Sequence, residues 1–295
     1  MPAISTRQSR IVAVVLALTT AVAAAVLFQV TRPEPESDRG SGRDSRRPQA
    51  PRSAGFVRGV YGHDSSGAGL KQVSSVGFDT VTVTPDVARL NQLEEKGLRG
   101  VVWLGAYDST KCTFERDDRW IRDAVQRIAG HRAILVYQIT DEPNHNTCPQ
   151  APRQITERAE LVESLDPGVP TYVTVPAWDG KEGFPYRHFA QTTDIMGLVV
   201  YPCLNKSKEC WFKMIDRAIA EASSANIKRY WAVVQNFQTE WYRLPTSGEL
   251  EEQFDRWSRS RMSGYFVYQW SPEQTASDDE RMQAFERLNE SPLRS

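Results

Sequence analysis

The sequence has almost no net charge. Its 36 Lys and Arg residues nearly balance its 37 Asp and Glu residues, so the formal net charge is -1 over 295 residues. The first 53 residues hold eight Arg and four acidic residues, which leaves 28 basic and 33 acidic side chains in the remainder. This remainder lacks the basic surplus with which proteins neutralise phosphate backbones, and we therefore expect no nucleic-acid partner.

Several catalytic signatures are also missing. The chain has no Ser-centred nucleophile elbow and its four His residues are scattered, so acyl-transfer chemistry has no support. Residues 62–67, after the first apolar run, match poorly to the Gly-rich phosphate turn of open doubly wound sheets. We expect no cofactor and no metal.

Long apolar runs are scarce. Residues 11–30 form a run long enough to cross a bilayer, and Arg7 and Arg10 before it predict that the rest of the chain is exported. We predict a signal peptide or membrane anchor over residues 1–30. The length of the run favours an anchor, whereas small residues at 23–25 suit a signal peptidase. Residues 31–54 contain no aromatic residue and no Val, Ile or Leu, which predicts a flexible linker.

The remaining residues, 55–295, alternate short apolar runs with helix-like stretches. Eight such units in about 240 residues predict a single (β/α)8 TIM barrel, and parallel strands buried on both faces are typically this continuously apolar. The alternative is an open doubly wound sheet. The predicted strands are 56–62, 78–84, 100–108, the apolar start of 134–144, 171–177, 195–202, 230–237 and 264–270.

Two adjacent carboxylates, Asp141 and Glu142, end the fourth predicted strand, and Pro143 then interrupts it. Charge at the end of a buried strand is costly unless it lies in a polar cleft or has partners. One carboxyl group raises the pKa of its neighbour, which suits a group that must hold a proton near neutral pH. The alternative is that Asp141 caps the loop and Glu142 forms a surface salt bridge. Adjacent strand residues normally point to opposite faces.

Aromatic and polar side chains gather at the ends of the predicted strands, where TIM barrels build their active sites. Each aromatic residue alone is more often core packing, but many of them beside carboxylates and amides favour a sugar site. We therefore expect an oligo- or polysaccharide ligand. The predicted catalytic residues are Glu142 and Asp141, and the predicted substrate-binding residues are Tyr61, Asp64, Trp103, Tyr107, Trp178, Tyr201, Gln235 and Trp270.

The four Cys residues all follow predicted strands three, four and six. In an exported domain they should be oxidised. We predict Cys203 with Cys210 and Cys112 with Cys148, one of three possible pairings. A metal site is the alternative, but six residues between Cys203 and Cys210 is not a common zinc spacing.

Several short motifs, taken in order over residues 56–288, resemble the (β/α)8 glycoside hydrolases of clan A, and especially bacterial, largely uncharacterised members of that superfamily. The resemblance implies that Glu142, in the strand-four position, is the general acid/base. The motifs are Asp141-Glu142-Pro143, Tyr201-Pro202, the 234–237 stretch VQNF, the 243–246 stretch RLPT with Glu249, and the 264–270 strand ending in Trp.

The sequence departs from that family at strand seven, where Gln235 stands in the position of the nucleophilic Glu. An amide is a far poorer nucleophile than a carboxylate, which puts the usual retaining mechanism in doubt. A second carboxylate from Glu240, Glu273, Asp108 or Asp141 is one solution. The other is a catalytically inactive glycan-binding or cell-wall interaction module. In either case we expect an extracellular monomer, secreted or attached through residues 1–30.

Overall fold

The strands form a closed barrel, as the sequence predicts. The computed structural model describes residues 55–177, 183–270 and 279–290. Within them, eight parallel strands close into a barrel in the order β1-β2-β3-β6-β7-β8-β9-β10. These strands are β1 Val57–Val60, β2 Thr80–Val83, β3 Arg99–Trp103, β6 Ile134–Thr140, β7 Thr171–Pro176, β8 Ile195–Val200, β9 Tyr230–Gln235 and β10 Gly264–Tyr268.

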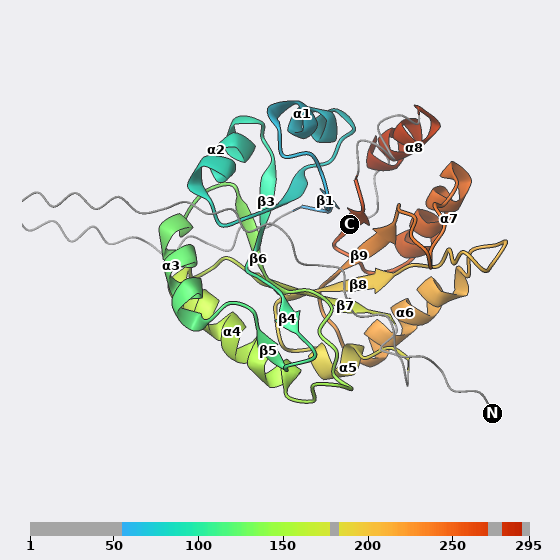
Figure 1. The fold of residues 1–295 in the computed structure, drawn as a ribbon. Helices are drawn as coiled ribbons and strands as arrows, with labels where there is room; N and C mark the ends of the chain where they lie inside the picture. Colours follow the sequence, from blue (N-terminus) through green and yellow to red (C-terminus); the bar gives the residue numbers. More distant parts are fainter. Residues whose placement is uncertain (1–54, 178–182, 271–278, 291–295) are drawn as a thin grey trace, which may run out of the picture. The chain divides into compact units, whose positions relative to one another are not determined.

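The described helices follow one another around the outside of the strands in chain order (Figure 1). Thr246 and Glu249 form a capping box at the start of α7, where the side chain of each residue accepts the backbone N–H of the other. The helices are α1 Gly67–Ser75, α2 Val87–Glu95, α3 Asp118–Ile128, α4 Ala151–Leu165, α5 Tyr186–Phe189, α6 Lys213–Ser224, α7 Ser247–Ser258 and α8 Asp279–Glu290.

The third predicted strand, 100–108, is too long. β3 ends at Trp103, and Gly105 takes a φ of 117°, a backbone conformation that residues with a side chain rarely adopt. The chain then forms a separate antiparallel hairpin from β4 Tyr107–Asp108 and β5 Thr113–Phe114. Tyr107 and Asp108 therefore belong to this hairpin and do not stand at the end of a barrel strand.

Inward-facing rings fill the barrel axis. Tyr172, Trp231 and Phe266 lie on β7, β9 and β10 and are fully buried, with ring centroids 4.8 Å apart for the first two and 5.2 Å apart for the last two. Gly197 on β8 makes room for this layer, because a Cβ atom there would overlap the Tyr172 ring. A larger apolar core lies between the sheet and the helices.

Both predicted disulfides are confirmed. Cys112 bonds to Cys148 and Cys203 bonds to Cys210, across 36 and 7 residues of sequence. The first joins the loop of the β4–β5 hairpin to the segment after β6, and the second closes the loop after β8. Both pairs thus link segments that follow barrel strands.

The predicted N-terminal apolar run, 11–30, and the predicted linker, 31–54, lie outside the described residues. In the part of the chain that is described, none of the helices combines the length and the hydropathy needed to cross a bilayer.

Candidate functional site

A cavity of about 490 Å³ opens at the carboxyl ends of the barrel strands, a size that suits a small ligand. Its lining comes from β2, β3, β6, β7, β8, β9 and β10, from the segments after β1, β2, β6 and β8, and from α1 and α2. Of the residues predicted from the sequence, the structure brings together Tyr61, Trp103, Asp141, Glu142 and Tyr201 at this cavity.

Asp141 and Glu142 both line the cavity, although adjacent residues of a regular strand would point apart. β6 ends at Thr140, and Glu142 takes a φ of 43°, in the left-handed region that non-glycine residues seldom adopt. This backbone turn brings the second carboxyl group to the same side as the first. A residue held in this conformation is a candidate for function.

Thr174 on the neighbouring strand β7 holds both residues in place. The backbone N–H of Glu142 donates to the Thr174 carbonyl oxygen at 3.1 Å and to its hydroxyl oxygen at 3.2 Å. The Thr174 hydroxyl in turn donates to the carboxylate of Asp141. The two carboxyl groups are therefore attached to the rigid edge of the barrel.

Both carboxyl groups hold protons more tightly than usual. They are open to the cavity, yet enough protein surrounds them to exclude much of the water that would stabilise their charge. This desolvation, together with the negative charge of Asp141, raises the pKa of Glu142 to about 7. Desolvation also raises the pKa of Asp141, while the hydrogen bond from Thr174 favours its ionised form.

Aromatic rings form one wall of the cavity. The rings of Tyr201 and Tyr268 stack with centroids 6.0 Å apart, and Tyr61 meets Tyr268 edge-on at 6.2 Å. The Tyr61 and Tyr172 hydroxyls share a hydrogen bond of 2.9 Å, which connects the cavity to the buried ring layer below it. Burial and the nearby carboxylates raise the pKa of Tyr201, so its hydroxyl stays protonated and can donate to a ligand.

Several residues of the cavity are not among those predicted from the sequence. Burial lowers the pKa of His63 to about 4, so its imidazole is neutral near pH 7, and its Nδ1 has no hydrogen-bond partner among the described residues. Gln138 is buried and its Oε1 is likewise unpaired there. Tyr268 lies inside the eighth predicted strand but is not among the predicted substrate-binding residues. Strand periodicity was the available signal for it, because Phe266 faces the barrel axis and Tyr268 lies two residues further on.

Asp64 and Tyr107 do not line the cavity. The Asp64 carboxylate accepts hydrogen bonds from the backbone N–H and the hydroxyl of Ser66, and these bonds lower its pKa. Ser66 itself caps α1, so Asp64 supports the start of that helix. Tyr107 is buried and its hydroxyl donates to Gln154 at 2.6 Å. Its place in the hairpin, beyond the Gly105 turn, takes it away from the strand ends.

Gln235 is also turned away from the cavity. Its Oε1 accepts the backbone N–H of Cys203 at 2.9 Å, and its Nε2 donates to the carbonyl oxygens of Cys203 and Arg243 at 3.2 and 2.9 Å. The side chain is fully buried and uses its acceptor and both donors on backbone groups. It therefore ties together the loops after β8 and β9.

Trp270 lies in the core, 1% exposed, with its ring 5.1 Å from Phe78 and 5.6 Å from Phe285. β10 ends at Tyr268, so Trp270 lies beyond the strand. Trp178 and Glu273 lie outside the described residues. Among the residues that are described, the carboxylates lining the cavity are Asp141 and Glu142, whereas Glu240 and Asp108 lie elsewhere.

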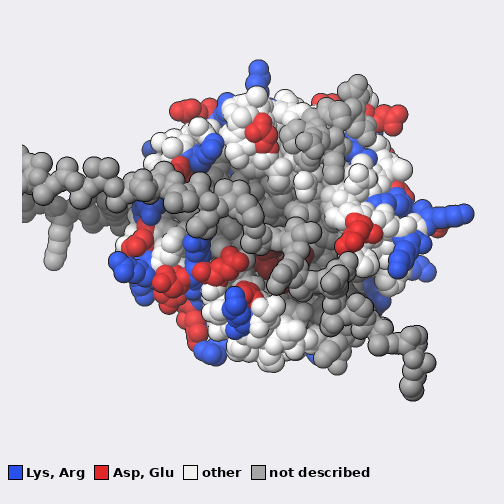
Figure 2. Space-filling view, viewed as in Figure 1, with Lys and Arg blue, Asp and Glu red and all other residues white. Residues whose placement is uncertain are grey.

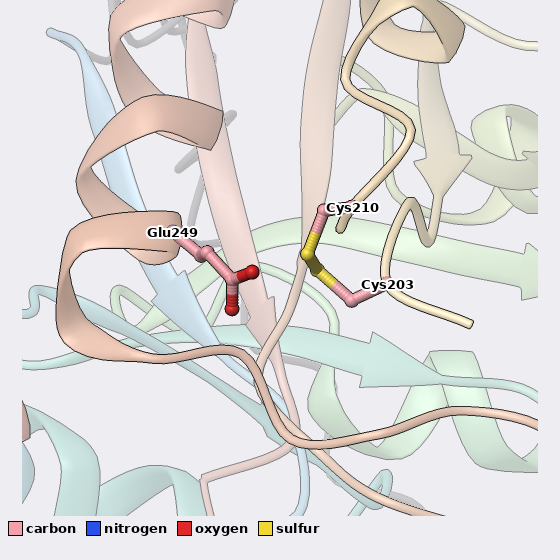
Figure 3. A group of neighbouring side chains, drawn as sticks. All are labelled: Cys203, Cys210 and Glu249. Atoms are coloured by element: carbon pink, nitrogen blue, oxygen red, sulfur yellow. A yellow bond between two sulfur atoms is a disulfide. The ribbon is translucent and has the colours of Figure 1, made fainter. Parts of the chain in front are cut away.

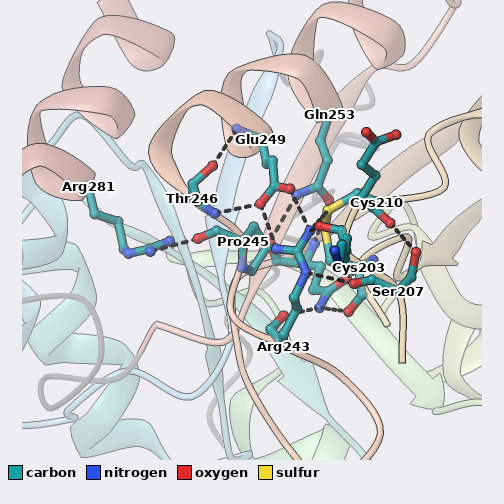
Figure 4. The surroundings of a disulfide bond; sticks show 12 residues. Cys203, Ser207, Cys210, Arg243, Pro245, Thr246, Glu249, Gln253 and Arg281 are labelled. Carbon is teal, nitrogen blue, oxygen red and sulfur yellow. Dashed lines mark hydrogen bonds and ion pairs between the residues drawn. A yellow bond between two sulfur atoms is a disulfide. The ribbon is translucent and has the colours of Figure 1, made fainter. Parts of the chain in front are cut away.

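Cys203, Cys210 and Glu249 form a group whose ligand atoms lie within 4.8 Å of one another. Figure 3 shows that the two sulfur atoms are bonded to each other and that the Glu249 carboxylate points toward them. A disulfide lacks the thiolates that bind metals. Glu249 instead pairs with the Arg243 guanidinium, which also donates to the carbonyl oxygens of Ser207 and Lys208 (Figure 4). This group is a structural clamp on the loop after β8.

Charged side chains of both signs are interspersed around the described part of the face drawn in Figure 2. On this face, the described residues do not gather into the continuous basic surface that nucleic-acid binding requires.

Comparison with known proteins shows similarity in fold. No family model matches the sequence, and no curated protein sequence matches it. Many solved structures match this chain, among them a β-galactosidase, a mannanase and a β-glucuronidase. A β-galactosidase from the psychrophilic Marinomonas ef1 has a TM-score of 0.59 at 10% identity, over 79% of this chain and 59% of its own. An endo-β-1,4-mannanase from Thermotoga petrophila has a TM-score of 0.56 at 10% identity, and the match covers 80% of this chain and 76% of the mannanase chain. A Lactobacillus rhamnosus β-glucuronidase has a TM-score of 0.59 at 15% identity, and the match covers 81% of this chain and 50% of the β-glucuronidase chain.

This chain therefore has the TIM-barrel fold found in these glycoside hydrolases. It spans about three fifths of the β-galactosidase and half of the β-glucuronidase. At identities of 10–15% the likeness concerns the fold.

Proposed function

We propose that this protein is an exported glycoside hydrolase-like barrel that acts on an oligo- or polysaccharide, with Glu142 as the proton donor. The observation that carries the proposal is the position of Asp141 and Glu142, held by Thr174 on the wall of an open cavity lined by aromatic rings. Burial and the charge of Asp141 also raise the pKa of Glu142 to about 7. A carboxyl group with such a pKa keeps its proton near neutral pH, as a general acid must.

The two carboxyl groups take different roles. Glu142 donates its proton to the glycosidic oxygen while the bond from that oxygen to the anomeric carbon breaks. Water then attacks the anomeric carbon and returns a proton to the Glu142 carboxylate. The Asp141 carboxylate, which accepts a hydrogen bond from the Thr174 hydroxyl, stabilises the positive charge that develops on the sugar ring. Tyr61, Trp103, Tyr201 and Tyr268 offer ring faces and hydroxyl or indole N–H donors to the sugar.

The fold likeness supports a carbohydrate ligand, since a β-galactosidase, a mannanase and a β-glucuronidase share this barrel. Two disulfides support export, because such bonds persist in oxidising compartments. The apolar run at 11–30 supports the same proposal.

A second candidate function is glycan or cell-wall binding without hydrolysis. Gln235 favours it, because the strand-seven position offers a buried amide that is fully engaged by backbone groups. On this alternative the aromatic cavity holds a sugar and Glu142 only hydrogen-bonds to it.

The test measures glycan binding and reducing-sugar release by the purified protein over a glycan panel. Hydrolysis predicts that Glu142→Gln abolishes release while binding persists, and that Glu160→Gln, on the exposed surface of α4, changes neither. Binding by the wild-type protein without release supports the second function. Unchanged release by Glu142→Gln removes that residue from the mechanism. If the wild-type protein shows no binding and no release, both functions are contradicted.

A further inference from the structure

A second concave surface lies beside the loops after β8 and β9. It encloses about 380 Å³ and is lined by Leu204, Lys206, Glu240, Trp241 and Tyr242, which we call the Trp241 groove. Trp241 is 63% exposed and Leu204 is 41% exposed. Together with Tyr242 they form an apolar surface rimmed by the polar residues Lys206 and Glu240, and such rimmed apolar patches mark ligand-binding grooves.

The groove is built on rigid backbone. Leu204 and Tyr242 form an antiparallel bridge, and the Asn205 N–H donates to the Trp241 carbonyl oxygen at 2.9 Å. The Thr239 hydroxyl accepts the backbone N–H groups of Trp241 and Tyr242, both at 3.2 Å. The indole therefore projects from a fixed turn, so little conformational freedom remains to be lost when a ligand stacks on it.

The Cys203–Cys210 disulfide and the Arg243–Glu249 pair fix the other side of the groove (Figure 4). The Arg243 N–H donates to the Cys203 carbonyl oxygen at 3.1 Å, directly beyond the Leu204–Tyr242 bridge. The clamp thus holds the segment that carries Leu204 against the segment that carries Trp241.

Tyr242 connects the groove to the active-site cavity. Its ring centroid lies 5.6 Å from that of Tyr201, which lines the cavity, and 5.4 Å from that of Phe237. Tyr201, Tyr242 and Trp241 therefore lead from the cavity to the exposed groove.

We propose that the Trp241 groove binds sugar units of the same chain whose glycosidic bond lies in the cavity, so that the protein prefers oligosaccharides of several units. The proposal rests on the proposed function. A pyranose ring presents C–H groups to an indole face, and the neighbouring Lys206, Glu240 and Tyr242 supply hydrogen-bonding groups at the rim. Continuity with the cavity favours a further part of the same ligand over an unrelated partner.

The experiment titrates the full chain with β-1,4-linked glucose, mannose and N-acetylglucosamine oligosaccharides of increasing length. We expect the affinity of the wild-type protein to rise with the length of the oligosaccharide. In Trp241→Ala this rise should be about three- to tenfold smaller, because one aromatic stacking contact supplies a factor in that range. The matched control is Trp211→Ala, which removes an indole 48% exposed that does not line the groove, and it should keep the full length dependence.

Three results would overturn the inference. An identical length dependence in Trp241→Ala and wild type removes Trp241 from ligand binding, while binding of short oligosaccharides leaves the proposed function intact. A concentration-dependent dimer that Trp241→Ala abolishes assigns the groove to self-association. Failure of the wild-type protein to bind any member of the series overturns the inference, and failure on the wider glycan panel as well contradicts the proposed function.

Discussion

The backbone N–H of Glu142 lies 3.1 Å from the carbonyl oxygen of Thr174 and donates a hydrogen bond to it. Glu142, the residue proposed as proton donor, lies beyond the end of its own strand, β6. The bond joins it to the neighbouring strand, β7. It secures a backbone turn that an isolated chain would rarely adopt, since Glu142 has a φ of 43°. The position of the carboxyl group in the cavity thus depends on strand pairing in the barrel.

The first prediction concerns the pH dependence of hydrolysis. The proposed acid works only while protonated, so kcat/KM should fall as pH rises through about 7, the pKa of Glu142. Part of that pKa comes from the negative charge of Asp141, and Asp141→Asn should therefore move the alkaline limb to lower pH. Asp123→Asn, on the exposed face of α3, serves as the control. An unchanged limb in Asp141→Asn would contradict the proposed coupling.

The second prediction concerns stability. Since the folded-state pKa of Glu142, about 7, exceeds its ordinary value of 4.5, the folded protein binds more protons than the unfolded chain between these values. Wild-type stability should fall as pH rises through this window. Glu142→Gln lacks this titrating group. Its free energy of unfolding, relative to that of the wild-type protein, should therefore increase by on the order of 1 kcal/mol from pH 4 to pH 8, allowing for water in the cavity. Urea unfolding at both pH values measures it, and a constant difference would refute it.

The third prediction tests Gln235. A carboxylate in its place would face the carbonyl oxygens of Cys203 and Arg243, which now accept hydrogen bonds from its amide. We expect Gln235→Glu to lose about 2 kcal/mol of unfolding free energy, increasingly so at higher pH, and to gain no hydrolytic activity. Gln238→Glu, an exposed residue of the same segment, should be nearly neutral. Gain of activity in Gln235→Glu would show that this side chain can reach the cavity.

The fourth prediction compares the two disulfides. Chain entropy assigns about 4 kcal/mol to the Cys112–Cys148 link, which spans 36 residues, and about 2.5 kcal/mol to Cys203–Cys210, which spans 7. The paired Cys→Ser variants should therefore rank in that order in urea unfolding. Loss of the short link should also weaken binding of long oligosaccharides, because it releases one side of the Trp241 groove. The reverse order would mean that the Arg243 clamp depends on the disulfide.

The fifth prediction tests the ring layer inside the barrel. A methyl group at Gly197 would overlap the Tyr172 ring and come within 2.9 Å of the Thr174 methyl group. Gly197→Ala should cost about 1–3 kcal/mol of unfolding free energy and, through Tyr172 and Thr174, disturb the cavity. Gly248→Ala is the matched control, because a Cβ atom there meets nothing within 4 Å. Equal stability of the two variants would show that the ring layer can move aside.

The sequence was sufficient for the barrel because continuous apolar runs and their spacing report directly on parallel strands buried on both faces. It was not sufficient for the hairpin after β3. The 100–108 stretch reads as one apolar strand, and only the φ of 117° at Gly105 separates its two halves.

The site was predicted in part for a related reason. Local sequence identified Asp141 and Glu142, but alternation along a strand placed them on opposite faces, whereas the turn at Glu142 and the bonds from Thr174 bring both to the cavity. Gln235 and Trp270 are predicted substrate-binding residues because they stand at the ends of predicted strands. Long-range hydrogen bonds and packing, which a single sequence does not display, turn the first toward backbone and bury the second.

The layer formed by Tyr172, Trp231 and Phe266 occupies the barrel axis beneath the cavity. For the proposed function this means that a sugar chain cannot thread through the barrel, so reactant and product would exchange through the same mouth. A fragment left after cleavage would delay the next encounter until it diffuses out. Departure of the product is accordingly a candidate for the slowest event in each turnover.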